Sequence, residues 1–219
     1  LTNHSVVILE KNHERTILAY RGASEVLKEK DIPFKKLRAK WIYLAPITGI
    51  LCQAFEKIVN FAKEKGMKVA ANPSIAQLSL ANFSDIAKKI DILILNQEEA
   101  SFFTKIPSEH EQEIFKKIDE LCQGVVVMTK GGGGVSVSDG KNVYRAQPLP
   151  DREIVDITGA GDAFGSGFVA EFIRSNGDIE KAIQFGMANS KGNLSQIGAK
   201  TGLLKKGDTF ERVEVKTVK

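Results

Sequence analysis

The 219-residue sequence predicts an α/β fold built on a largely parallel central sheet. Short, uninterrupted apolar runs alternate with stretches of helical periodicity, which is typical of parallel strands that are buried on both faces. After the four glycines at 131–134 the pattern changes to two alternating apolar–polar segments joined by Asp139-Gly140, a strong hairpin signal. We therefore expect one layered α/β domain over residues 1–219 that also contains antiparallel strands.

The composition is that of an ordinary soluble domain. Apolar residues make up 42% and charged residues 26%, which excludes a disordered chain, collagen and a disulfide scaffold. The net charge of +4 is small and spread along the chain, so nothing favours nucleic acid or a membrane as a partner. Cys52 and Cys122 are far apart and lack metal-ligand spacing, which indicates reduced core cysteines and a cytoplasmic location.

The first half of the chain is expected to begin with a hairpin over 3–20 that stands apart as a flap. Its two arms, 5–10 and 16–20, are β-branched and aliphatic, and a polar turn at 11–14 separates them. Buried strands are then expected at 41–45, 67–71, 91–95 and 124–129. Helices are expected at 50–65, 82–90, 97–104 and 109–122.

The second half begins with the alternating strands at 135–138 and 142–146. Helices are expected at 160–174 and 179–195, and a final alternating strand at 212–218. The chain opens on Leu1 and immediately enters a strand, so we expect a fragment of a longer protein.

Three polar or glycine-rich segments follow predicted strands, at the place where open α/β sheets bind ligands. The first is Asn96-Gln97-Glu98-Glu99, and the second runs from Thr129 to Gly134. The third, residues 156–162, opens a long predicted helix.

The third segment carries the clearest chemistry. Gly159-Ala160-Gly161 lets the backbone approach a ligand closely, and a helix N-terminus presents free N–H groups to an anion. Asp162 is explained by the preference for acidic residues in a first turn when taken alone. Beside the glycines, we interpret it as a general base that removes the proton of an acceptor hydroxyl during phosphoryl transfer.

The other two segments each have two interpretations. Residues 129–134 form either a plain turn or a glycine surface for a nucleotide, and they are not a Walker A loop because a strand follows them. Asn96 and Glu99 either cap the helix that they begin or, in the case of Glu99, direct charge toward a hydrated magnesium ion.

Together these motifs resemble the PfkB, or ribokinase-like, carbohydrate kinase family. The segment VDITGAGDAFGSGF at 155–168 resembles the C-terminal signature of that family. Asn96-x-x-Glu99 is similar to its NxxE motif, and Thr129-x-Gly131-x-x-Gly134 to its TxGxxG motif. The resemblance implies a three-layer α/β/α fold and ATP-dependent phosphorylation of a hydroxyl, usually on a sugar or nucleoside.

The resemblance also implies roles for individual residues. Asp162 would be the catalytic base, with an anion hole made by the backbone of Gly159, Ala160 and Gly161. The ATP site would be lined by Asn96, Thr129, Gly131, Gly134 and Asn189. Glu99 would act on Mg²⁺ through water, and potassium is a further candidate ion, held by Asp156, Thr158 and the backbone of the loop around Gly198.

The sequence departs from the family pattern in two places. Gly202 stands where several members have a serine, which removes a side-chain ligand of the potassium ion. The strand and Gly-Gly motif that open other members are not in this chain, so we expect most of the acceptor-binding half to be missing and the 3–20 hairpin to be the remnant of a β lid. Exposed sheet edges would favour pairing, so a homodimer is one candidate assembly.

Three alternatives stay open behind a sugar kinase. The first is a nucleoside kinase of the same family, and the second is a truncated, non-catalytic nucleotide-binding member. A dinucleotide-binding oxidoreductase ranks last, because its glycine motif would lie between the first strand and helix of a βαβ unit.

Overall fold

The computed structural model describes residues 2–9, 15–150 and 154–218. The expected turn at 11–14 therefore lies outside the described residues. Within them, seven strands form one sheet in the order of the chain, β3-β4-β5-β6-β7-β8-β9. These strands are β3 (Trp41–Leu44), β4 (Lys68–Ala71), β5 (Ile92–Asn96), β6 (Val125–Thr129), β7 (Val135–Ser138), β8 (Val143–Ala146) and β9 (Val215–Val218).

The sheet is parallel from β3 to β6 and antiparallel from β6 to β9. The parallel half is the part that the solid apolar runs predicted, and the antiparallel half is the part that followed the four glycines. The carboxyl ends of β5 and β6 lie side by side, since Asn96 pairs with Thr129.

Alternate residues of the central strands enter two separate cores, which makes the fold three-layered. On β5, Leu93 and Leu95 pack with the helices of one face, and Ile92 and Ile94 with those of the other. All four side chains are at most 2% exposed. A strand buried on both faces needs apolar residues at every position, and this explains the uninterrupted runs in the sequence.

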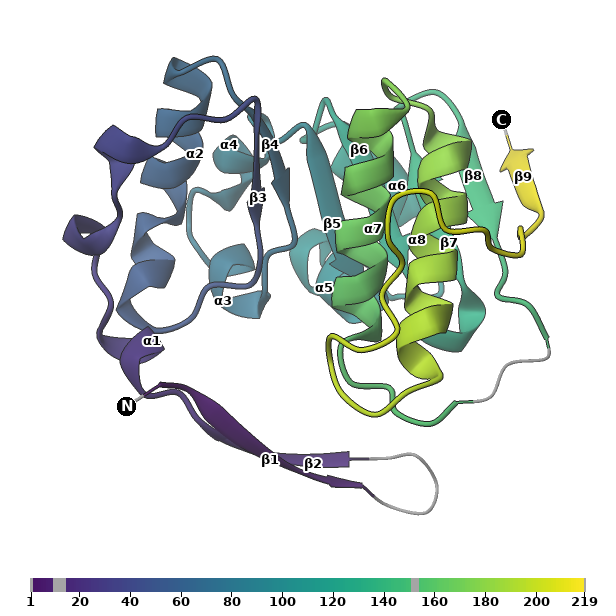
Figure 1. Cartoon of the computed structure of the whole chain (residues 1–219). Helices are drawn as coiled ribbons and strands as arrows, with labels where there is room; N and C mark the ends of the chain where they lie inside the picture. The colour runs from purple at the N-terminus through teal and green to yellow at the C-terminus, as the bar shows by residue number, and fades with distance from the viewer. Residues whose placement is uncertain (1, 10–14, 151–153, 219) are drawn as a thin grey trace.

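The helices cover the two faces unequally (Figure 1). One face carries α2 (Phe55–Glu64), α4 (Phe83–Ala87) and α6 (Glu111–Asp119), and the other carries α7 (Ala160–Arg174) and α8 (Ile179–Leu194). The remaining helices are α1 (Ala23–Val26), α3 (Ile75–Leu78) and α5 (Gln97–Thr104). Within the described ranges, no helix is long and apolar enough to cross a membrane.

The hairpin forms a small sheet of its own. The strands β1 (His4–Leu9) and β2 (Arg15–Tyr20) pair antiparallel and extend away from the layered body (Figure 1). Val6 is 57% exposed and Leu18 is 58% exposed, so this hairpin buries little apolar surface against the rest of the chain. The expected hairpin is therefore present as a two-stranded sheet separate from the central one.

Several expected element boundaries were wrong: the helices expected at 82–90 and 109–122 are shorter, at Phe83–Ala87 and Glu111–Asp119. Two further differences have a physical explanation in the structure. The predicted helix at 50–65 begins as a 3₁₀ turn at Gly49–Ala54 and becomes α-helical at Phe55, a common arrangement at helix N-termini. The strand expected from residue 212 begins at Val215. The backbone of Val213 instead hydrogen-bonds the side-chain amide of Gln184 on α8, at 2.6 and 2.9 Å, which removes it from strand pairing.

Candidate active site

The three segments singled out in the sequence meet around one cavity of about 460 Å³. Asn96 at the end of β5, Thr129 at the end of β6 and Gly161 at the start of α7 all line it. The cavity lies beyond the carboxyl ends of two parallel strands, where the fold leaves room for a ligand. Residues from α8 complete it: Met187, Ala188, Ser190, Lys191 and Leu194.

The N-terminus of α7 presents its backbone to this cavity. Gly159 caps the helix in a left-handed conformation, with a φ of 85°, and Ala160 and Gly161 form its first turn. The first N–H groups of an α-helix have no partner within the helix. A β-carbon added to Gly161 would meet no atom within 4 Å, so the space beside this residue is open. The arrangement is suited to binding an anion.

Asp162 lies in the same first turn, with an exposed side chain. Its negative charge acts on two neighbouring groups. Burial, followed by the charge of Asp162, raises the pKa of Tyr43 on β3 to about 12. The Tyr43 hydroxyl fits beneath α7 because Gly165 has no side chain: a β-carbon there would be 2.9 Å from the hydroxyl oxygen.

Asn96 and Glu99 form the reciprocal cap that one of the two interpretations predicted. The Glu99 amide donates to Asn96 Oδ1 at 2.8 Å, and the Asn96 amide donates to Glu99 Oε2 at 2.8 Å. Burial raises the pKa of Glu99, the hydrogen bond from Asn96 opposes this, and the charges of Glu98 and Asp162 add to the rise. Repulsion from two neighbouring carboxylates is the situation that a bound cation would relieve.

The glycine segment forms a tight turn between β6 and β7. Gly131–Gly133 is a single 3₁₀ turn, closed by a hydrogen bond from the Lys130 amide to the Gly134 carbonyl at 2.8 Å. Gly134 has a φ of 83°, and a β-carbon there would lie 2.1 Å from the Ala146 carbonyl oxygen. Gly131 faces open space and lines the cavity. Gly134 is thus needed for packing, and Gly131 exposes backbone to a ligand.

Asp156 joins the approach to α7 to a loop that follows α8. This buried carboxylate accepts hydrogen bonds from the Thr158 amide at 2.8 Å and the Gly198 amide at 3.0 Å. Among the described residues, Thr158 Oγ1 and Asn193 Oδ1 are buried without a hydrogen-bond partner. Oxygen atoms without a hydrogen-bond partner are of the type that hard cations take as ligands.

Gly202, the departure from the family pattern, has a steric explanation. Its φ is +68°, and a β-carbon there would lie 2.0 Å from the Gly192 carbonyl oxygen. The two glycines bring the loop directly against α8. A serine at 202 would therefore force the loop and the helix apart.

Asn189 lies apart from the cavity lining. It is 4% exposed, and its amide donates to the Ala163 carbonyl at 2.6 Å and accepts from the Leu204 amide at 2.8 Å. Its side chain joins α8 to α7 and to the segment that follows, while its neighbours Ala188 and Ser190 line the cavity.

Several cavity residues were missed by the sequence reasoning. The apolar wall includes Pro148, Leu149, Ile154 and Val213, which come from irregular segments. None of these residues belongs to one of the three segments singled out in the sequence, and Val213 falls in the stretch that was expected to be a strand. Lys191 and Glu211, which also line the cavity, form an ion pair at 3.0 Å.

Comparison with known proteins identifies the class to which this fold and site belong. The family model described as pfkB family carbohydrate kinase matches residues 1–206. The chain belongs to this family. It is 29% identical to a cytidine kinase of Thermococcus kodakarensis, over 81% of this chain and 63% of that protein. It is 26% identical to a ribokinase of Haemophilus influenzae, over 98% of this chain and 70% of that protein.

Solved structures agree on the ribokinase-like fold. A probable sugar kinase from Rhizobium etli superimposes with a TM-score of 0.77 at 23% identity, covering 91% of this chain and 62% of its own. An adenosine kinase from Sinorhizobium meliloti gives a TM-score of 0.77 at 21% identity, covering 90% of this chain and 62% of its own. The chain thus spans less than two thirds of the length of both, and these likenesses establish the fold alone.

Proposed function

We propose that the chain is the nucleotide-binding and catalytic part of an ATP-dependent kinase that phosphorylates a hydroxyl group of a sugar. The observation that carries this proposal is the position of the α7 N-terminus. Gly161 opens its backbone into the cavity, and Asp162 follows it directly with an exposed carboxylate. Donors for a phosphoryl group and an acceptor for a proton are therefore adjacent in one helical turn.

ATP would occupy the cavity in an orientation that its lining suggests. The apolar wall, including Leu149, Met187 and Val213, suits the flat faces of the base. Thr129 and Gly131 would lie along the ribose and phosphates, since the glycine turn allows close backbone approach. The γ-phosphoryl group would then face the N-terminus of α7.

The reaction needs little covalent chemistry from the protein. Asp162 takes the proton of the acceptor hydroxyl while the oxygen of that hydroxyl forms a bond to the γ-phosphorus of ATP. The bond from the γ-phosphorus to the β–γ bridging oxygen breaks at the same time, and ADP is released. The amides at residues 159–161 stabilise negative charge on the transferring group.

Two cations are part of the proposal. Magnesium supplies positive charge to the phosphates, and Glu99 would hold it through water, a role supported by the like-charged carboxylates around that residue. Potassium would be held by Asp156, Thr158 and the backbone at Gly198, supported by the orphaned oxygens of Thr158 and Asn193. Glycine at 202 leaves this potassium site without one side-chain ligand that several family members have.

A nucleoside is the second candidate acceptor, because several relatives are named as nucleoside kinases. A cytidine kinase and adenosine kinases stand beside a ribokinase among them. A non-catalytic nucleotide-binding role is the third candidate.

The test is a screen for ADP release with sugars and nucleosides, using a form of the protein extended upstream and its Asp162→Asn variant. We expect turnover with one acceptor class and a loss of at least about 100-fold in Asp162→Asn, with Mg-ATP affinity unchanged. Near-parental turnover in the variant would refute the base assignment. ATP binding without turnover on any acceptor would favour the non-catalytic role.

A further inference from the structure

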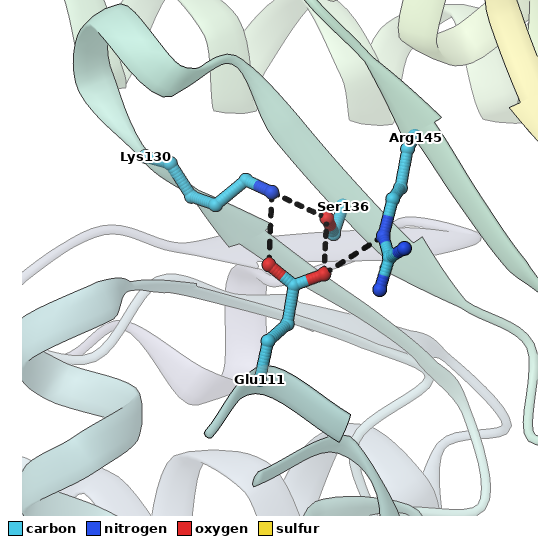
Figure 2. A network of polar contacts seen from close by, with 4 residues as sticks. All are labelled: Glu111, Lys130, Ser136 and Arg145. Carbon is cyan, nitrogen blue, oxygen red and sulfur yellow. Dashed lines mark hydrogen bonds and ion pairs between the residues drawn. The ribbon is translucent and has the colours of Figure 1, made fainter. Parts of the chain in front are cut away.

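Glu111, Lys130, Ser136 and Arg145 form a compact network of charged and polar groups (Figure 2). Three of them, Glu111, Lys130 and Arg145, line a pocket that is separate from the nucleotide cavity. The Glu111 carboxylate, in the first turn of α6, is at the centre of the network. Lys130 Nζ donates to Glu111 Oε2 at 2.8 Å, and Arg145 Nε donates to Glu111 Oε1 at 3.0 Å. Ser136 Oγ donates to Glu111 Oε1 at 2.9 Å and accepts from Lys130 Nζ at 2.8 Å.

Most of the network is shielded from solvent, and Arg145, whose side chain is 35% exposed, lies at its edge. The side chains of Lys130 and Glu111 are 13% and 17% exposed, and Ser136 is fully buried. Burial raises the pKa of Glu111, but hydrogen bonds from Lys130 and Ser136 and the charges of Lys130 and Arg145 outweigh it and hold the pKa below its ordinary value. Glu111 is thus held in its charged form, and removing one partner would leave another buried charge unpaired.

Lys130 is also the residue from which the glycine turn begins, and its backbone is hydrogen-bonded to that turn. The Lys130 amide donates to the Gly134 carbonyl, and the Lys130 carbonyl accepts from the Gly133 amide, both at 2.8 Å. Glycines have no side chains with which to fix a loop, so the position of the turn depends on the residues at its ends. Gly134 is fixed by contact with Ala146, and Lys130 is fixed by Glu111.

We propose that Glu111 is a positioning residue for the nucleotide site, acting through Lys130 to hold the glycine turn in its binding conformation. This inference rests on the proposed function, because it assumes that ATP lies against that turn. Lys130 adjoins the glycines but lines the separate pocket and not the nucleotide cavity, so its ammonium group serves the turn and not the phosphates. Loss of the contacts that hold Lys130 should weaken nucleotide binding and leave the position of Asp162 unchanged.

The test is a calorimetric titration of a non-hydrolysable Mg-ATP analogue into the parent and its variants, with melting temperatures measured alongside. Glu111→Gln keeps the shape and removes the charge. Glu113→Gln is the matched control, since it removes a carboxylate from the same first turn of α6. The Glu113 side chain is 66% exposed and pairs with His110. The double variant Glu111→Gln/Lys130→Gln removes both charges and leaves no buried lysine unpaired.

We expect the analogue to bind about tenfold more weakly to Glu111→Gln and to the double variant, and normally to Glu113→Gln. If Glu111→Gln fails to fold, the double variant still decides the question. Parental affinity in a folded double variant would overturn the inference, since the network would then serve stability alone. A parent that binds no analogue would instead refute the proposed function, so the two failures are distinct.

Discussion

Gly159 lies in direct contact with the backbone of Ala199. A β-carbon at position 159 would be 2.4 Å from the Ala199 carbonyl oxygen and 2.8 Å from its Cα. The residue before α7 therefore packs on the loop that follows α8, and the same loop donates a hydrogen bond from the Gly198 amide to Asp156 Oδ2. Gly159 and Gly161 belong to one short motif but are glycine for different reasons. Position 159 has no room for a side chain, whereas position 161 has open space beside it.

Replacing Gly159 should damage the fold as well as the site. In Gly159→Ala, the new methyl group collides with Ala199, and alanine is strained at a φ of +85°. We expect a loss of about 2–4 kcal/mol in the free energy of unfolding, measured by denaturant titration. If the denaturation curve of Gly159→Ala has the same midpoint and slope as that of the parent, the loop around Ala199 moves aside at little cost in free energy, and the prediction is wrong.

Replacing Gly161 should damage the site and leave the fold intact. A β-carbon there meets no atom within 4 Å, and φ is not in the left-handed region. Gly161→Ala should melt within a few degrees of the parent, because alanine is the better helix former. The side chain narrows the approach to the α7 amides, so phosphoryl transfer should fall by about tenfold or more. Unchanged turnover in a stable Gly161→Ala variant would count against the anion hole.

Asp156→Asn should detach the loop that follows α8. An amide offers one oxygen, so it cannot accept from both the Thr158 and Gly198 amides in the same way. We expect a loss of about 1–3 kcal/mol, since a buried donor is left unsatisfied. The control is Asp208→Asn, whose carboxylate accepts from the Lys205 amide at an exposed site. Equal effects in both variants would contradict the special role of Asp156.

The Asp156→Asn variant also tests whether the chain binds potassium. Replacing K⁺ with choline should lower the melting temperature of the parent, since a cation bound by the folded state stabilises it. Asp156→Asn should lose that response, because the variant lacks the charged ligand. A parent indifferent to the exchange would remove potassium from the proposal.

The pKa of Tyr43 reports the proximity of Asp162. The folded-state pKa of about 12 lies above the ordinary value of 10.0. The stabilisation linked to the protonated phenol is therefore complete below pH 10 and is lost as the pH rises toward 12. In Asp162→Asn the pKa should fall, because one negative charge is removed. The measurement is the phenolate absorbance, with Tyr43→Phe as the subtraction control, and an unshifted pKa would contradict the geometry.

The sequence predicted the parts of the fold in which local pattern and tertiary environment agree. Residues 92–95 of β5 are all apolar because both faces of this strand are buried, and the helix at 160–174 has the expected bounds. It could not predict the wall of the cavity. Leu149 and Val213 reach it from irregular segments, whose positions depend on tertiary contacts such as that between Gln184 and Val213.

The site shows the same division at the level of single residues. Asn96, Thr129 and Gly161 were predicted from glycine and polar residues that follow strands, and all three line the cavity. Asn189 was selected by motif position alone, and its side chain is engaged by α7 and Leu204. Lys130 and Glu111 were not selected, because a contact between residues 19 apart in the chain leaves no local pattern.

The central claim is that ATP occupies the cavity between the glycine turn and the N-terminus of α7. Photo-crosslinking with a base-azido ATP, followed by peptide mapping, tests it most directly. The account predicts labelling that unmodified ATP competes away and that maps to the lining segments 129–134, 148–149, 154–157 or 187–194. Competed labelling on a different surface, such as the pocket around Arg174 and Phe210, would contradict it, as would the absence of saturable labelling.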